Sequence, residues 1–233
     1  MALVIFDCDG VLVDSEVLAH ETLVEMLTDL GHPISIDEAY RTFAGRSLKD
    51  TLSLIERLTG RAVPPETGAH YRERLFARFR IALKPVPGVG EAIAALPYRR
   101  CVASSSAPDR LDLALAVTGL APLFDGRVFS ATQVARGKPA PDLFLFAARA
   151  MDAEPVHCIV IEDSPLGVEA GLGAGMQVIG FAGAAHATDA LARSLSDAGA
   201  HRVIRAMQDL PACAEALLRR GQTPQQILPR CSE

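Results

Sequence analysis

Short apolar runs alternate with longer amphipathic segments along most of the chain. The runs are uninterrupted, as expected of parallel strands that are buried on both faces. They predict six strands, at residues 3–6, 101–103, 128–129, 158–161, 177–181 and 202–204. Helical patterns lie between them at residues 90–96, 108–118, 142–151 and 164–174. This order predicts an α/β protein with a Rossmann-like, doubly wound parallel sheet.

Residues 15–83 do not follow this alternation of strand and helix patterns. They contain four amphipathic helical patterns and no strand-like run, at residues 17–30, 36–43, 49–58 and 65–80. A helical block after the first strand of a sheet predicts an inserted all-α cap domain. We therefore expect a catalytic core of residues 1–14 and 84–221, a helical cap of residues 15–83 and a C-terminal tail of residues 222–233.

Composition and charge restrict the classes of binding partner that we expect for this chain. The 233 residues carry a net charge of −5, which offers no overall basic field for nucleic acid. No apolar run approaches the ~20 residues of a membrane-spanning helix. The N-terminus lacks the basic and long apolar regions of a secretion signal. Five scattered cysteines without zinc spacing fit a reducing compartment. We expect a cytoplasmic protein with no nucleic-acid, membrane or obligate protein partner.

Candidate chemistry collects where the predicted strands end, which is where open α/β sheets place their ligands. An acidic pair alone at a strand end is more often a helix cap. Four such features in order are hard to explain as capping. They are Asp7 and Asp9 after the first strand, Ser104 and Ser105 after the second, Lys138 in Gly-Lys-Pro, and Glu162 with Asp163 after the fourth.

These residue types suit phosphoryl transfer. Converging carboxylates repel one another unless a cation lies among them, and hard oxygen ligands favour Mg²⁺. A carboxylate that approaches a phosphate dianion at 4 Å faces roughly 8 kcal/mol of repulsion at an effective dielectric near 20. A metal ion and a lysine reduce this repulsion. One carboxylate can then attack while its neighbour protonates the leaving oxygen.

The same residues carry a resemblance. Residues 7–15 (Asp-Cys-Asp-Gly-Val-Leu-Val-Asp-Ser), Ser104, residues 137–139 and residues 161–164 are similar to the four ordered motifs of the haloacid-dehalogenase-like hydrolases. The helical insert extends the resemblance over nearly the whole chain. It is closest to the branch with a small helical cap, which includes β-phosphoglucomutase and many sugar-phosphate phosphatases.

The resemblance implies roles for these positions. Asp7 would form a phosphoaspartate, and Asp9 would be the general acid/base and lend its backbone carbonyl to Mg²⁺. Ser104 and Lys138 would hold the phosphoryl group, and Ser105 is a further candidate for that contact. Asp163, with Glu162, would complete the metal site that Asp7 and Asp9 begin.

Neighbouring residues have plainer interpretations. Cys8 should point away from Asp7 and Asp9 because side chains alternate along a strand. We expect Asp14 and Ser15 to cap the first cap helix, and His20 to lie on a surface or helix face.

The cap should set the substrate. Arg46, Ser47 and Lys49 are candidate contacts to its polyol or carboxylate end. By ungapped count, the mutase's cap histidine and arginine fall on Ala19 and Leu48, and the phosphonatase's cap lysine also falls on Leu48. This count makes the mutase and the phosphonatase activities less favoured, and it excludes neither of them. The favoured function is hydrolysis of a small sugar or sugar-acid phosphate. Its alternatives are a hexose-phosphate mutase and a non-catalytic phosphate-binding or regulatory protein.

Overall fold

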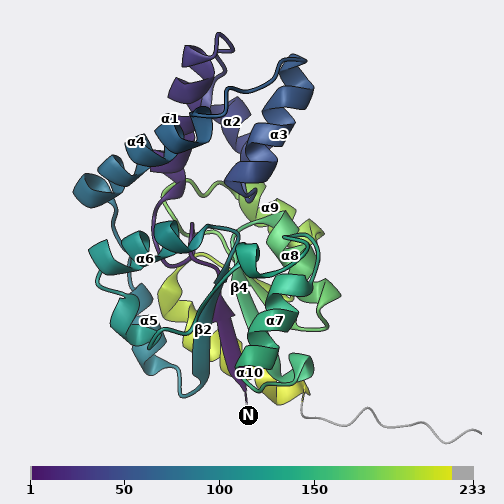
Figure 1. Ribbon diagram of the computed structural model, residues 1–233. Helices are drawn as coiled ribbons and strands as arrows, with labels where there is room; N and C mark the ends of the chain where they lie inside the picture. The colour runs from purple at the N-terminus through teal and green to yellow at the C-terminus, as the bar shows by residue number, and fades with distance from the viewer. Residues whose placement is uncertain (1, 222–233) are drawn as a thin grey trace, which may run out of the picture.

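The computed structural model describes residues 2–221, so the predicted tail and Cys231 lie outside the described residues. Six parallel strands form one sheet in the order β3-β2-β1-β4-β5-β6 (Figure 1). The strands are β1 (Leu3–Phe6), β2 (Arg99–Ser104), β3 (Val128–Ser130), β4 (Cys158–Glu162), β5 (Gln177–Phe181) and β6 (Arg202–Ile204). The predicted α/β sheet is confirmed. The order reverses at β1, so crevices for ligands open at the carboxyl ends of β1 and its neighbours.

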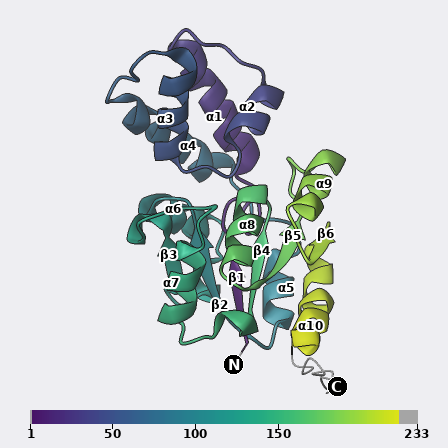
Figure 2. The same cartoon turned by 90° about the vertical axis from the view of Figure 1, so that its right-hand side faces the viewer.

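Helices cover both faces of the sheet (Figure 2). They are α5 (Val89–Ala95), α6 (Pro108–Val117), α7 (Asp142–Ala150), α8 (Pro165–Gly173), α9 (Asp189–Asp197) and α10 (Leu210–Gly221). Short 3₁₀ turns join them at Ala121–Leu123, Ala131–Gln133, Pro155–His157 and Met207–Asp209. Helices α9 and α10 were not predicted. Only Leu195 of α9 is buried, so its short sequence carries little apolar pattern.

The alternation of side chains along the strands divides the core into two layers. Val4 and Phe6 of β1 face the layer that includes residues of α5, α6 and α10. Leu3 and Ile5 of the same strand face the layer of α7, α8 and α9. All four side chains are at most 1 % exposed, which explains why this strand is apolar without interruption.

The segment between β1 and β2 is helical, as predicted. Its helices are α1 (Glu16–Asp29), α2 (Ile36–Phe43), α3 (Leu48–Thr59) and α4 (Thr67–Ala82). They pack together above the carboxyl edge of the sheet (Figures 1 and 2). Gly60 ends α3 in the left-handed conformation, at φ 66°, where glycine carries no steric penalty. The exact domain limits at residues 14/15 and 83/84 stay a prediction.

The two connections between the helical segment and the sheet run side by side. Val13 forms an antiparallel bridge with Pro85. The Asp14 N–H donates to the Lys84 carbonyl at 2.9 Å, and the Val86 N–H donates to the Leu12 carbonyl at 2.9 Å. These bonds anchor the first cap helix directly beyond Asp7 and Asp9. Within residues 2–221, no helix combines the length and the apolar character needed to cross a bilayer.

Candidate active site

Three neighbouring strands bring the predicted motifs together. Phe6 of β1 is in register with Val102 of β2 and with Ile161 of β4. Asp7, Ser104 and Glu162 therefore follow at the same edge of the sheet. The Asp7 N–H donates to the Ile161 carbonyl at 3.0 Å, which extends the ladder to the aspartate itself. The strand-end juxtaposition expected from the sequence is present in the fold.

Lys138 joins two of these carboxylates. Its Nζ lies 2.7 Å from Asp7 Oδ1 and 2.5 Å from Glu162 Oε1, and its side chain is only 2 % exposed. The ammonium also lies 5.0 Å from the centre of the Phe144 ring. Burial disfavours the charged ammonium, but the carboxylates of Asp7 and Glu162 outweigh it and raise the pKa of Lys138. Lys138 is thus a fixed positive charge beside Asp7.

Asp7, Glu162 and Asp163 form an acidic cluster in which one oxygen of each lies within 4.8 Å of the others. Burial raises the pKa of the Asp7 carboxyl well above its usual value, although Lys138 opposes the shift. Burial, followed by the charge of Glu162, raises the pKa of Asp163. Crowded carboxylates of this kind are relieved by a bound cation. The oxygen donor set fits Mg²⁺.

Two glycines make room for this cluster. A Cβ at Gly10, where φ is +71°, would lie 1.8 Å from Asp163 Oδ2. A Cβ at Gly167 would lie 1.9 Å from the Glu162 carboxylate. The main chain therefore approaches both acidic side chains more closely than any other residue type would allow.

Asp9 points to a separate set of donors. The Ser106 hydroxyl donates to Asp9 Oδ2 at 2.5 Å, and the Arg110 Nη2 donates to Oδ1 at 2.6 Å. The Ser15 hydroxyl also donates to Oδ1. Burial opposes ionisation, but the charge of Arg110 outweighs it and lowers the pKa of Asp9. Both oxygens of the candidate acid/base are held in place.

Several of these partners were not anticipated. Ser15 occupies the N-cap position of α1, but its side chain makes no capping bond, so the capping interpretation of its hydroxyl was wrong. Arg110 carried no sequence signal, because it lies outside the motifs in a chain that uses arginine freely. Ser104 and Ser105 both line the cavity, and Ser104 is buried. Their contact with phosphate stays a prediction. Cys8 is fully buried among apolar side chains, consistent with a structural role.

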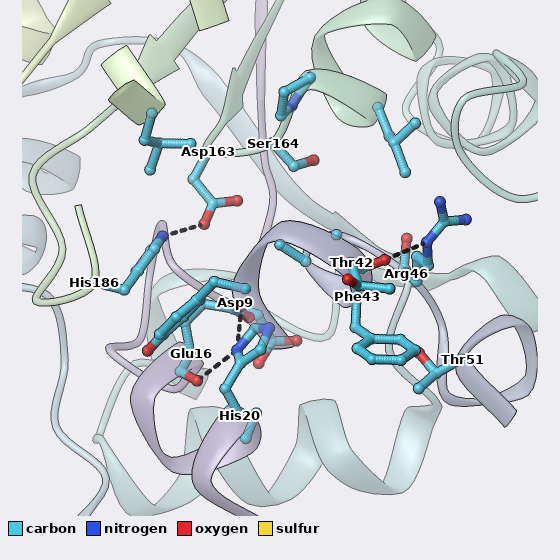
Figure 3. A pocket seen from close by; sticks show the side chains of 18 of the residues that line it. Asp9, Glu16, His20, Thr42, Phe43, Arg46, Thr51, Asp163, Ser164 and His186 are labelled. Atoms are coloured by element: carbon cyan, nitrogen blue, oxygen red, sulfur yellow. Dashed lines mark hydrogen bonds and ion pairs between the residues drawn. The ribbon is translucent and has the colours of Figure 1, made fainter. Parts of the chain in front are cut away.

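A cavity of about 660 Å³ lies between the acidic cluster and the cap helices, large enough for a small phosphorylated metabolite. Figure 3 shows the side chains that enter it. His20 lines the cavity and is 5 % exposed, so the surface expectation for this residue was wrong. Its ring stacks on Tyr40 with centroids 4.1 Å apart, and burial lowers its pKa to about 4.

The three candidate cap contacts lie in different places. Arg46 lines the cavity, and its Nε donates to the Thr42 carbonyl at 3.2 Å (Figure 3). Ser47 and Lys49 do not line the cavity as the structure describes it. The Ser47 hydroxyl caps α3 by accepting from the Asp50 N–H at 3.1 Å. Leu48 lines the cavity in their place.

Known proteins place this arrangement in a family. The model of haloacid dehalogenase-like hydrolases matches residues 1–175. A 6-phosphogluconate phosphatase of Escherichia coli is 30 % identical over 184 residues, which cover 78 % of this chain and 83 % of that protein. A phosphorylated carbohydrates phosphatase of Thermotoga maritima is 31 % identical, over 93 % of this chain and all of that protein.

A solved structure also supports the assignment of the chain to this family. The crystal structure of a conserved haloacid dehalogenase-like protein of unknown function from Agrobacterium tumefaciens superposes with a TM-score of 0.81. It is 40 % identical and covers 93 % of this chain and 99 % of its own. The matched family and relatives agree with the strand-end motifs. The chain belongs to the haloacid dehalogenase-like hydrolases, and within that family it is a phosphatase.

Proposed function

We propose that this enzyme is a Mg²⁺-dependent phosphatase that hydrolyses a small sugar or sugar-acid phosphate through a phosphoaspartate on Asp7. The observation that carries the proposal is the position of Lys138. Its buried ammonium contacts Asp7 and Glu162 directly beside the acidic cluster. A dianionic phosphoryl group can approach Asp7 only where positive charge offsets the repulsion.

In the first half-reaction, an Asp7 carboxylate oxygen attacks phosphorus. The new bond joins this oxygen to phosphorus, and the ester bond to the leaving oxygen breaks. Asp9 supplies the proton that the leaving oxygen takes up. The Ser104 hydroxyl, the Ser105 side chain and Lys138 would hold the phosphoryl oxygens. Since Arg110 favours the ionised form of Asp9, this contact has to loosen when Asp9 receives its proton.

In the second half-reaction, water attacks the phosphorus of the phosphoaspartate. Asp9, now ionised, takes the proton from that water, and the bond between phosphorus and the Asp7 oxygen breaks. Free phosphate leaves and the Asp7 carboxylate is restored. The ion pair between Arg110 and Asp9 suits this step, because it stabilises the form of Asp9 that acts as a base.

Asp7, Asp163, Glu162 and the backbone carbonyl of Asp9 would hold Mg²⁺. When bound, the ion offsets negative charge on the phosphoryl oxygens and on the cluster. The raised pKa values of Asp7 and Asp163 support a cation at this position, because the cluster is strained electrostatically without one.

The proposed substrate class rests on the cavity and on the relatives. A cavity of about 660 Å³ suits a monosaccharide-sized phosphate better than a macromolecule. The Escherichia coli relative is a 6-phosphogluconate phosphatase and the Thermotoga relative acts on phosphorylated carbohydrates. Arg46 would contact the polyol or carboxylate end of such a substrate from the cap. Ser47 and Lys49 remain weaker candidates, because neither lines the cavity.

A phosphate-release screen tests the proposal. The panel should contain sugar, sugar-acid and glycolytic phosphates with Mg²⁺, and the Asp7→Asn variant should serve as the blank. We expect release from at least one sugar or sugar-acid phosphate by the wild type alone. Isomerised sugar phosphate in place of free phosphate would favour a mutase. Inactivity across the panel would favour a non-catalytic binding protein.

A further inference from the structure

Glu16 is a cavity residue that none of the sequence motifs includes. It lies in the first turn of α1, and its side chain, 13 % exposed, lines the cavity. The hydroxyl of Ser15, the residue before it, donates to Asp9 Oδ1. Figure 3 shows Glu16 and His20 on the side of the cavity where Asp9 lies. Glu16 therefore borders the space beyond the leaving oxygen that Asp9 would protonate.

The two carboxylate oxygens of Glu16 have different surroundings. Oε2 lies 3.3 Å from His20 Nδ1, which also lies 2.9 Å from the Glu16 carbonyl oxygen. Because a carbonyl oxygen can only accept, Nδ1 is the donor to both. Oε1 forms no hydrogen bond within residues 2–221. It is not among the side-chain polar atoms that are buried there without a partner, so it keeps accessible surface in the cavity.

The histidine that contacts Oε2 is itself held by stacked rings. Its ring lies on Tyr40 with centroids 4.1 Å apart, and Tyr40 lies parallel to His186 with centroids 6.1 Å apart. His186 belongs to the loop between β5 and α9 of the core. The partner of Oε2 is thus packed between the cap and the core, which limits the positions open to the Glu16 carboxylate.

A structural role accounts for only part of this arrangement. A carboxylate in the first turn of a helix interacts favourably with the helix dipole, but an exposed side chain does so as well. The contact with His20 uses Oε2 alone. No lysine or arginine within residues 2–221 forms an ion pair with Glu16, and carboxylates that are largely buried are rarely unpaired. Oε1, unpaired and accessible, is placed to accept from a ligand in the cavity.

Neighbouring charges favour a hydroxyl over an ammonium group as that donor. Burial, followed by the charge of Asp9, raises the pKa of the Glu16 carboxyl, and the charges of His186 and Arg110 oppose the shift. The positive charge of Arg110 thus acts on this part of the cavity and disfavours a second cation. A hydroxyl donates a hydrogen bond without adding charge.

We propose that Glu16 is a specificity-determining residue whose Oε1 accepts a hydrogen bond from a substrate hydroxyl on the carbon next to the ester carbon, and whose charge excludes a carboxylate from that place. The inference rests on the proposed phosphatase function and deepens it. The hydroxyl lies near the ester because Glu16 borders Asp9. The substrate class is a polyol phosphate in which any carboxylate lies at the end far from the ester.

Three small phosphate esters test this position. They are 2-hydroxyethyl phosphate, ethyl phosphate and phosphoglycolate, whose second carbon is a hydroxymethyl, a methyl and a carboxylate group. The kcat/KM of each is measured by phosphate release with Mg²⁺, for the wild type, Glu16→Ala and Glu16→Gln. The matched control is Glu21→Gln, an exposed carboxylate of the same helix that pairs with Arg78. Ratios between substrates cancel any effect that is common to all three.

We expect the wild type to prefer 2-hydroxyethyl phosphate to ethyl phosphate by about tenfold, the effect of one hydrogen bond to a charged group. Phosphoglycolate should be poorer than ethyl phosphate by about tenfold, because its carboxylate would face Glu16. Glu16→Ala should lose both preferences. Glu16→Gln should accept phosphoglycolate as well as ethyl phosphate and keep part of the preference for the hydroxyl through its amide oxygen. Glu21→Gln should leave both ratios unchanged.

Equal kcat/KM values for 2-hydroxyethyl phosphate and ethyl phosphate with the wild type would overturn the inference and leave the phosphatase proposal intact. Unchanged ratios in Glu16→Ala would also overturn it. If the alanine variant does not fold, an unchanged exclusion of phosphoglycolate by Glu16→Gln would have the same meaning. Failure of the wild type to release phosphate from p-nitrophenyl phosphate and from the wider panel would remove the proposed function and this inference together.

Discussion

The two walls of the cavity are built on different principles. The core wall consists of charged side chains that are fixed by partners, as Lys138 is by Asp7 and Glu162. The cap wall combines stacked rings and aliphatic groups with charged side chains such as Arg41 and Arg46, which are both exposed. The Arg46 side chain donates to the Thr42 carbonyl of its own segment. Buried and paired charge is therefore concentrated where a phosphoryl group would react.

This difference assigns separate tasks to the two walls. Preorganised charge in a buried site acts strongly on a transition state, so changes in the core should alter kcat. Contacts from the cap act on the remainder of the substrate, so changes there should alter KM and substrate preference. The two walls contact each other where the ring of Tyr40 stacks on that of His186. The following predictions test this division, from the largest expected effect to the smallest.

Replacing Asp7 should have the greatest effect. Asp7→Asn removes the nucleophile and should lower kcat by about 10⁵-fold or more, the scale seen when a covalent catalyst is deleted. Initial rates of phosphate release, with circular dichroism as a check of folding, measure it. The matched control is Asp142→Asn, an aspartate of the same domain that pairs with the exposed Arg136. Substantial turnover by Asp7→Asn would exclude it as the nucleophile.

Lys138→Ala should lower kcat by about 10³-fold, because it removes a buried charge that offsets repulsion at the phosphoryl group. Lys84→Ala is a suitable control, since Lys84 is exposed. The measurement is kcat at saturating substrate and Mg²⁺. Near-normal kinetics in the first variant would contradict the role given to the core wall.

Asp163→Asn should weaken Mg²⁺ binding yet stabilise the metal-free protein. The folded-state pKa of Asp163 is raised above its usual 3.8, so the folded protein binds this proton more tightly than the unfolded chain. Stability of the metal-free wild type therefore falls as the pH rises from 3.8 toward the raised value. At pH 7 the metal-free variant should therefore be more stable than the metal-free wild type.

Denaturant unfolding in EDTA, with and without added Mg²⁺, measures both effects. A variant that is less stable than the wild type at pH 7 without metal, or that keeps its Mg²⁺ response, would show that the cluster is not a strained cation site.

Arg46→Ala should raise KM for a sugar-acid phosphate by about tenfold, the effect of one charge-assisted contact, and leave kcat nearly unchanged. Ser47→Ala is the matched neighbour. It should destabilise the protein by about 1 kcal/mol through loss of the helix cap, without a change in KM. Steady-state kinetics and thermal melts separate the two. A loss of kcat in Arg46→Ala would contradict the assignment of kcat effects to the core wall and of KM effects to the cap wall.

The core wall was predictable from sequence for a physical reason. The carboxyl ends of parallel strands lie at one edge of the sheet. The register of β1, β2 and β4 therefore brings Asp7, Ser104 and Glu162 together there, and the conformation of the loops is not needed to predict it. Their residue types then restrict the chemistry. The apolar runs of β1 and β4 were visible because both faces of these strands are buried.

The cap wall and the supporting residues were not predictable to the same extent. A shift of one residue turns a helical side chain by ~100°, so counting did not separate Leu48, which lines the cavity, from Ser47, which caps α3. Arg110 and His186 reach the site from α6 and from the β5–α9 loop. Contacts between segments that lie far apart in the chain cannot be recognised from local sequence patterns.

The central claim is that Asp7 is the residue that becomes phosphorylated. Wild-type enzyme should be mixed with substrate and Mg²⁺, quenched in acid during turnover and digested for peptide mass spectrometry. The account predicts a phosphoryl group on Asp7 in the N-terminal peptide, absent from the Asp7→Asn control. Active enzyme that yields no phosphorylated peptide, or one modified at another residue, would contradict it.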